Sequence, residues 1–208
     1  MTRTEVLAEL RSIIDDTVAP YAWSNARLMN WLSLGQTQFC RDSGFFRDSQ
    51  NYTLTTIPGI MTYPLAPEII EVLSVWNGVS QVMQDVQIML FDAPSAPFGW
   101  KVNLDSSYLA LSAPPDAVYT LSMRVWRGAR TALTSQGGEL EISPDFHLAP
   151  VEWAAAKAFG DHDRERQDPV KAADHLANYK AIAREGKRAF RKLCGGETAI
   201  VPNALYLV

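Results

Sequence analysis

Four acidic side chains lie close together in the sequence around His147: Glu139, Glu141, Asp145 and Glu152. A glycoside hydrolase needs a pair of carboxyl groups, because one protonates the leaving oxygen while the other attacks the sugar or activates water. The same residues are typical of a solvated loop before a helix, whose positive N-terminal end favours nearby acids. We favour the structural interpretation, since surface chains offer many such pairs. A glycan-cleaving (cell-wall) hydrolase using Glu139–Glu152 is the enzyme alternative.

The sequence offers few other candidates for catalysis or for holding a metal ion. The three histidines, His147, His162 and His175, have no ligand-like spacing. The two cysteines, Cys40 and Cys194, form neither a zinc motif nor a redox pair. The sequence also lacks a glycine-rich phosphate loop and a nucleophile elbow. Candidate sites in the sequence are therefore few, and we expect no metal site.

A stripe of basic side chains is predicted along one face of the last helix: Lys180, Arg184, Lys187, Arg188 and Arg191. The surrounding residues 157–192 carry a net charge of +4, whereas residues 1–156 carry −7. Such a stripe is either a solvated face or a contact for an acidic neighbouring subunit or a nucleic-acid backbone. A nucleic-acid-binding module that uses this helix is thus a further alternative. The acidic body, however, is unlike a free DNA-binding domain.

Two helices are predicted in residues 143–193. Ser143-Pro144 and Asp168-Pro169 are typical helix starts, because serine and aspartate cap free amides and proline suits the first turn. Pro150 lacks a backbone donor, so it predicts a kink or a restart in the first helix. The second helix has residues spaced three and four apart that predict a packing seam with a small centre, and we expect the two helices to form an antiparallel pair. The seam comprises Leu176, Tyr179, Ala183, Gly186, Phe190 and Leu193.

Two more helices are predicted near the N-terminus. Thr2 and Glu5 have the spacing of a capping box, which starts a helix over residues 3–15. Ser24 caps the next helix, and Gly44 ends it. Its inner face comprises Leu28, Trp31, Leu32, Gly35 and Phe39.

Between the helices, residues 51–127 have the pattern of strands and turns. Pro58-Gly59 and Asn77-Gly78 are hairpin turns. The first is expected to join strands 52–57 and 60–65, and the second to join strands 69–76 and 79–83. A third pair, 100–104 and 108–112, flanks a turn, and residues 117–127 alternate between apolar and polar side chains. Residues 85–91 are ambiguous and could form a helical turn.

The C-terminal segment, residues 195–208, is apolar and begins with Gly195-Gly196. Exposed apolar residues are a liability in a monomer, so this segment either folds back on its own chain or docks on a partner. Its apolar side chains include Ile200, Val201, Leu205, Tyr206 and Leu207.

These elements predict an α+β fold in one domain, residues 1–208. A helical bundle is expected from N-terminal residues 1–46 and C-terminal residues 143–193, with residues 51–127 inserted as an antiparallel β region of hairpins. Hydrophobic content of 47% and charged content of 20% are ordinary for a globular protein. The chain has neither a membrane-spanning apolar run nor a signal-peptide core, so we expect no membrane partner.

Four stretches resemble, in order, the head-to-tail adaptor (connector, or head completion) proteins of tailed bacteriophages. Each combines an apolar pattern with turn residues at similar spacing. The first two are Trp23-Ser24, Leu28, Trp31-Leu32, Gln36, Phe39-Cys40 and Gly44-Phe45-Phe46, then Tyr52-Thr53-Leu54, Pro58-Gly59 and Tyr63-Pro64-Leu65. The other two are Leu109-Ala110-Leu111 with Pro114-Pro115-Asp116, then Ile142-Ser143-Pro144, His147 and Glu152-Trp153-Ala154-Ala155.

The resemblance implies a structural virion protein, made in the host cytoplasm, that assembles as a ring at the head–tail junction. Such rings are typically dodecameric, join the portal protein to a tail or nozzle protein, and surround the DNA exit channel. DNA would pass through without sequence-specific binding. The resemblance also implies that the protein is not an enzyme and has no catalytic residues and no cofactor. We expect the portal contact at Ile200, Val201, Leu205, Tyr206 and Leu207. The expected subunit interface comprises Leu176, Tyr179, Lys180, Ala183, Arg184, Gly186 and Arg188.

Overall fold

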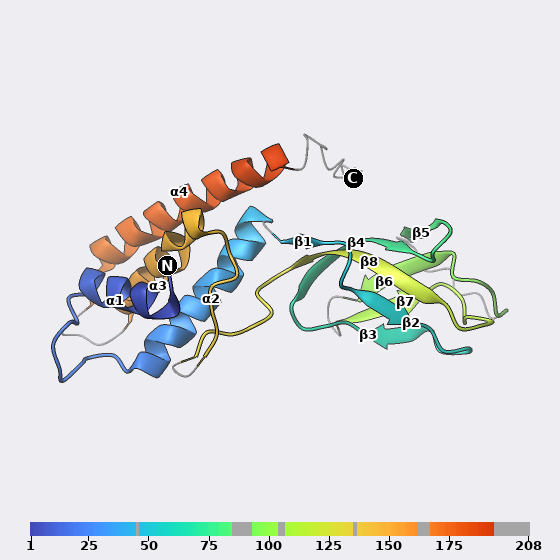
Figure 1. Ribbon diagram of the computed structural model, residues 1–208, viewed down its shortest axis with the longest axis horizontal. Coiled ribbons are helices and arrows are strands. Elements are labelled where there is room, and N and C mark those ends of the chain that lie inside the picture. The colour runs from blue at the N-terminus through green and yellow to red at the C-terminus, as the bar shows by residue number, and fades with distance from the viewer. Residues whose placement is uncertain (45, 85–92, 104–106, 135–136, 162–166, 194–208) are drawn as a thin grey trace, which may run out of the picture.

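The computed structural model describes residues 1–44, 46–84, 93–103, 107–134, 137–161 and 167–193. The molecule is elongated, with helices packed together at one end and strands at the other (Figure 1). The helices are α1 (Arg3–Ile13), α2 (Asn25–Ser43), α3 (Leu148–Gly160) and α4 (Pro169–Leu193). The strands are β1 (Arg47–Asp48), β2 (Thr53–Thr55), β3 (Thr62–Pro64), β4 (Ile69–Trp76), β5 (Gln81–Gln84), β6 (Gly99–Asn103), β7 (Tyr108–Leu111) and β8 (Thr120–Arg127).

Capping contacts confirm the predicted starts of both N-terminal helices and the end of the second, whereas α1 ends at Ile13, before the predicted residue 15. The backbone N–H of Glu5 donates to the Thr2 hydroxyl at 3.3 Å, and the Glu5 carboxylate accepts the Thr2 N–H at 2.8 Å. The Ser24 hydroxyl accepts the N–H of Arg27. Gly44 ends α2 in the left-handed region, with φ of 67°, which a glycine adopts without strain.

Helix α4 begins after its predicted cap, whereas α3 begins later than the predicted start at Ser143-Pro144, and the Ser143 side chain makes no capping hydrogen bond. A 3-10 turn over Pro144–Phe146 precedes α3, which starts afresh at Leu148. Pro150 therefore lies in the first turn of α3, where its missing donor costs no hydrogen bond. The Asp168 carboxylate accepts the N–H groups of Val170 and Lys171 and so caps α4.

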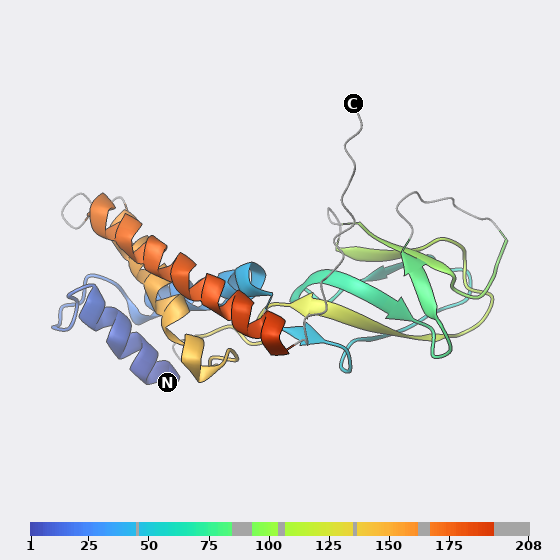
Figure 2. The same ribbon diagram turned by 90° about the horizontal axis from the view of Figure 1, so that it is seen from above.

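Helix α3 is the centre of the helical part. It packs against α1, α2 and α4, and it lies between α1 and α4 (Figure 1 and Figure 2). Small residues allow the close approaches. A Cβ atom on Gly35 of α2 would lie 3.0 Å from the Cα and carbonyl oxygen of Pro150. A Cβ on Gly186 of α4 would lie 2.7 Å from Cζ of Phe39 in α2.

The expected architecture, a helical bundle with inserted hairpins, is wrong. The described strands form one curled eight-stranded sheet, with the order β1-β8-β4-β5-β6-β7-β3 and β2 paired beside β8. The strands on either side of Pro58-Gly59 do not pair with each other, because β2 pairs with β8 and β3 pairs with β7. Only β4–β5 and β6–β7 are hairpins as predicted. The described residues therefore form a mixed α+β fold of four helices and a single curled sheet.

The parallel pairing of β5 with β6 joins the two halves of the sheet. The indole N–H of Trp100 in β6 donates to the carbonyl of Val82 in β5 at 3.1 Å, across this pairing. Trp100 is fully buried among the sheet's apolar side chains. The predicted alternation in β8 is confirmed, since Leu121, Met123 and Val125 are all buried on one face.

Candidate interaction surfaces

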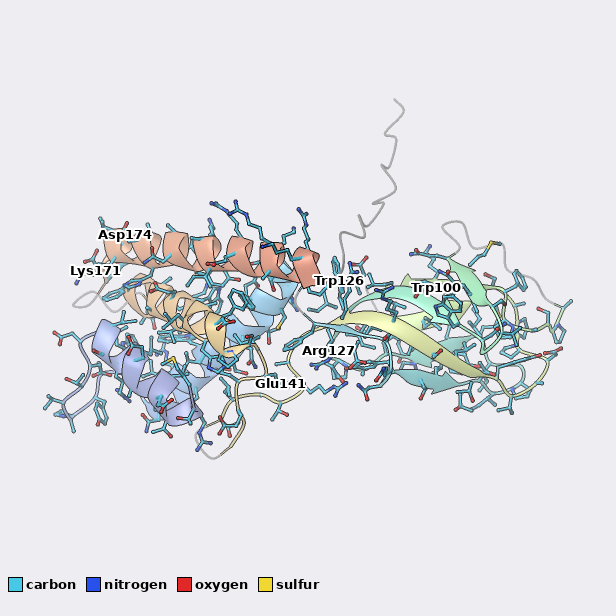
Figure 3. The ribbon with its side chains drawn as sticks, turned by 45° about the horizontal axis from the view of Figure 1, so that its top comes forward. Trp100, Trp126, Arg127, Glu141, Lys171 and Asp174 are labelled. Carbon is cyan, nitrogen blue, oxygen red and sulfur yellow. The ribbon has the colours of Figure 1, made fainter. Side chains whose placement is uncertain are left out.

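Arg127 links the sheet to the helical part of the molecule (Figure 3). It ends β8, and its guanidinium donates to the Glu141 carboxylate at 2.8 Å. The same guanidinium lies 3.7 Å from the Asp48 carboxylate of β1 and stacks over the Phe46 ring. Arg130 also pairs with Asp48, at 2.6 Å. One cluster of charges thus fixes the joint between the two parts.

Glu141 has a structural role at this joint. Its carboxylate accepts the backbone N–H groups of Arg130 at 2.6 Å and Thr131 at 2.9 Å. Its own N–H donates to the side chain of Gln36 in α2. Burial raises the pKa of the Glu141 carboxyl, but the hydrogen bonds from Thr131 and Arg127 outweigh burial and hold that pKa below its ordinary value. A general acid needs a raised pKa, so Glu141 is unsuited to that role.

The other three carboxylates of the predicted acidic group have separate partners. The Glu152 carboxylate is 2.7 Å from Nδ1 of His175 and ties α3 to α4. Glu139 accepts the N–H of Arg3 at the start of α1. Asp145 accepts a long hydrogen bond from the Ser143 hydroxyl. The geometry therefore lends no support to a paired-carboxylate hydrolase.

His147 holds the N-terminus in place. The terminal ammonium of Met1 donates to Nδ1 of His147 at 2.8 Å, while Nε2 of the ring donates to the carbonyl of Ile142. Within the described part of the chain, histidine, cysteine and acidic side chains gather into no group that could hold a metal ion.

The predicted packing seam of α4 contacts other helices of the same chain. Tyr179 and Ala183 are buried, and the Tyr179 hydroxyl donates to the Asp42 carboxylate of α2 at 2.5 Å. Burial raises the pKa of Tyr179, and the hydrogen bond to that carboxylate raises it further. Gly186 meets Phe39, as described above. Leu176 is partly exposed and lines a small hollow with Trp153.

The outer face of α4 carries cations. Nitrogen-tipped side chains extend from α4 on the side away from α3 (Figure 3). The predicted interface cations Lys180, Arg184 and Arg188 are all exposed. Lys187, Arg191 and Lys192 are exposed as well. The basic stripe therefore exists as a solvent-facing surface.

The sheet exposes apolar side chains at its turns. Val79, in the turn between β4 and β5, is 94% exposed, and Met83 in β5 is 72% exposed. This turn is well held, because the Asn77 side chain accepts the N–H groups of Val79 and Ser80. Ile57, Ile60 and Val118 are exposed in other loops of the sheet. Isolated exposed apolar residues are common, but a rigid turn with an apolar tip is a suitable contact for a partner.

The residues expected to bind the portal protein, Ile200, Val201, Leu205, Tyr206 and Leu207, lie outside the described residues, and so does the ambiguous stretch 85–91. Among the helices of the described chain, none has the length and apolar character to cross a membrane.

The model of the SU10 adaptor protein family matches residues 1–195. The match spans every helix and strand of the fold, as well as Arg127, Glu141 and the basic stripe of α4. No curated protein sequence matches the chain.

Proposed function

The chain belongs to the SU10 adaptor protein family, a family of phage head–tail adaptors, and from this we propose that it forms the ring that joins the portal protein to the tail. It is a structural protein of a bacteriophage and a component of the virion. The family match carries the proposal, because it covers the whole described fold.

The ring contains several copies of the chain, twelve by analogy with known connectors, and surrounds the channel through which DNA leaves the head. The net charge of −4 supports this arrangement. An acidic wall repels phosphate, so DNA passes without sequence-specific binding. The elongated shape supports it too, because the helices and the sheet offer separate surfaces to different partners (Figure 1).

Each partner is assigned a different surface. The exposed cations Lys180, Arg184 and Arg188 contact a neighbouring copy, next to Leu176 at the edge of α4. Tyr179, Ala183 and Gly186 support that surface by packing α4 onto α2. The rigid turn at Val79 contacts a tail or nozzle protein. The C-terminal segment, residues 195–208, docks on the portal protein, since its apolar residues require a covering surface.

Mass measurement of the purified protein tests this function. Native mass spectrometry and electron microscopy are applied to the protein alone and mixed with purified portal rings. The expected result is a closed ring of identical copies, formed alone or on the portal, with a central opening wide enough for duplex DNA. A chain that stays monomeric and is not retained by portal rings would refute the proposal.

A further inference from the structure

We propose that neighbouring copies join when the basic outer face of α4 docks on the acidic outer face of α1. This inference rests on the ring proposed above and names the two surfaces that meet. The occupant of each surface is thus a second copy of the same chain.

The outer face of α4 carries a row of basic side chains, with the exposed acids Asp174 and Glu185 at its margin. Lys180, Arg184 and Arg188 recur every four residues, so they share one side of the helix, and all three are exposed while Tyr179 and Ala183 are buried. A row of exposed small residues lies between these cations: Ala173, Ala177 and Ala181. Alanines let another helix come close, while the flanking cations attract an acidic one.

The outer face of α1 has the complementary pattern. Glu5 and Glu9 are exposed and four residues apart, so they lie on one flank of the helix, whereas Val6 and Leu10 are buried. Beside them lies a row of exposed small residues: Thr4, Ala8 and Ser12. One oxygen of Glu5 serves the capping box, but a carboxylate can accept from several donors at once.

The two faces also match in spacing. Four residues of an α-helix rise about 6 Å, so charges repeat at the same interval on α1 and α4. Two ion pairs can therefore form together when the rows of small residues pack against each other. Each exposed pair contributes little affinity alone, but complementary faces fix the register and exclude wrong partners.

The placement of the two faces favours a ring over a symmetric dimer. Helices α1 and α4 pack on different sides of α3, so their outer faces point away from each other (Figure 2). A copy that binds its neighbour through α4 keeps its own α1 free for the next copy. Such a head-to-tail contact closes into a ring when the rotation allows it, whereas a symmetric contact between two α4 faces would oppose like charges.

Charge reversal in two variants tests the inference. One variant carries Ala8→Lys and Glu9→Lys, which makes α1 basic and spares Glu5 in the capping box. The other carries Lys180→Glu, Arg184→Glu and Arg188→Glu, which makes α4 acidic. Each variant alone opposes like charges at every contact, so its self-association should weaken at least tenfold. Mixed in equal amounts, the two should form rings of alternating copies, because every contact again joins opposite charges.

Two controls make the result specific. Lys101→Glu reverses an exposed charge on the sheet and should leave assembly unchanged. Circular dichroism should show wild-type melting for both reversal variants.

If either variant forms rings alone as wild type does, or if the mixture forms none, the α1–α4 contact is wrong, although the proposed ring itself is not refuted. If the acidic α4 variant instead loses salt-sensitive binding to duplex DNA and is not rescued by mixing, the stripe binds DNA and the inference fails. A wild-type chain that forms no ring even with portal overturns both proposals.

Discussion

Arg127 contacts groups from both parts of the molecule. The pKa values of its two carboxylate partners reflect the contacts at the joint between these parts. Asp48 belongs to the sheet, whereas Glu141 lies in the segment that leads to the helices. Burial raises the pKa of Asp48, but hydrogen bonds from Asn51 and the nearby Arg130 outweigh burial and leave that pKa lowered. The pKa of Glu141 is lowered in a similar way. Both carboxylates are therefore stabilised in their charged forms by the folded state.

A lowered pKa in the folded state makes stability depend on pH. The unfolded chain binds more protons near pH 4, so this stabilisation is fully present above the ordinary carboxyl pKa values of 3.8 and 4.5. It is lost as the pH falls through the lowered, folded values. We predict that the urea midpoint falls on acidification below about pH 4.5, and that Asp48→Asn with Glu141→Gln flattens this dependence. Glu71→Gln, at an exposed position of β4, measures the effect of removing a carboxyl elsewhere. An unchanged acid slope in the double variant would contradict the assignment.

Cys40 is a second residue with a measurable signature. Burial in α2 raises the pKa of its thiol to about 12, despite the opposing influence of Arg127. Since the thiolate is the reactive form, Cys40 should resist alkylation at pH 8 in the folded protein. The experiment uses a Cys194→Ser background and iodoacetamide, with and without urea. Rapid labelling of Cys40 without denaturant would show that this part of α2 opens readily.

Helix α4 reaches α2 through Gly186, and this contact predicts a stability effect. A methyl group there would lie 2.7 Å from the Phe39 ring, so the ring or the helix must move. We predict that Gly186→Leu lowers the free energy of unfolding by about 1–3 kcal/mol, measured by urea titration. Gly160→Ala, also in a helix, is the matched control, because its nearest neighbour is 4.0 Å away at Ala172. Equal melting of Gly186→Leu and wild type would refute this packing.

The helices were more accessible to sequence reasoning than the sheet. The cap at Thr2, the stop at Gly44 and the restart near Pro150 depend on residues a few positions apart, which a sequence pattern records directly. The partners of β2 and β3 lie far along the chain, and the turn at Pro58-Gly59 suggested a hairpin that does not form. Local turn chemistry thus predicted the β4–β5 and β6–β7 pairings correctly and the pairing across Pro58-Gly59 incorrectly.

The candidate surfaces were predictable to a similar, partial extent. The cations of α4 were visible from their spacing, because an exposed helix face needs only a period of 3.6 residues. The sequence did not predict that Tyr179 and Gly186 pack within one chain, because the pattern of a packing seam does not identify the helix that it contacts. The cluster around Arg127 was also missed. Its carboxylates, Asp48 and Glu141, come from opposite sides of the β region and meet only after folding.

For the whole assembled molecule, the C-terminal segment gives the clearest prediction. Truncation after Cys194 removes the apolar residues but leaves every described element intact. The truncated protein should melt as wild type and still form rings, yet lose attachment to portal-containing heads. Co-sedimentation with purified heads measures this loss, and the full-length chain serves as the control. Equal binding by both proteins would show that the segment has another role.

The helical part is assembled from both ends of the chain, and this has a consequence for synthesis on the ribosome. The apolar face of α2 is complete at Ser43, but α3 begins only at Leu148. At 5–20 residues per second, roughly 5–20 s pass between the synthesis of α2 and that of α3, which covers this face. The strands of the sheet are synthesised during this interval. The nascent chain therefore exposes Leu28, Leu32 and Phe39 to other nascent chains and to chaperones. All the described strands are synthesised before α3, so a host short of chaperones should lose this protein to aggregation before any particle is built.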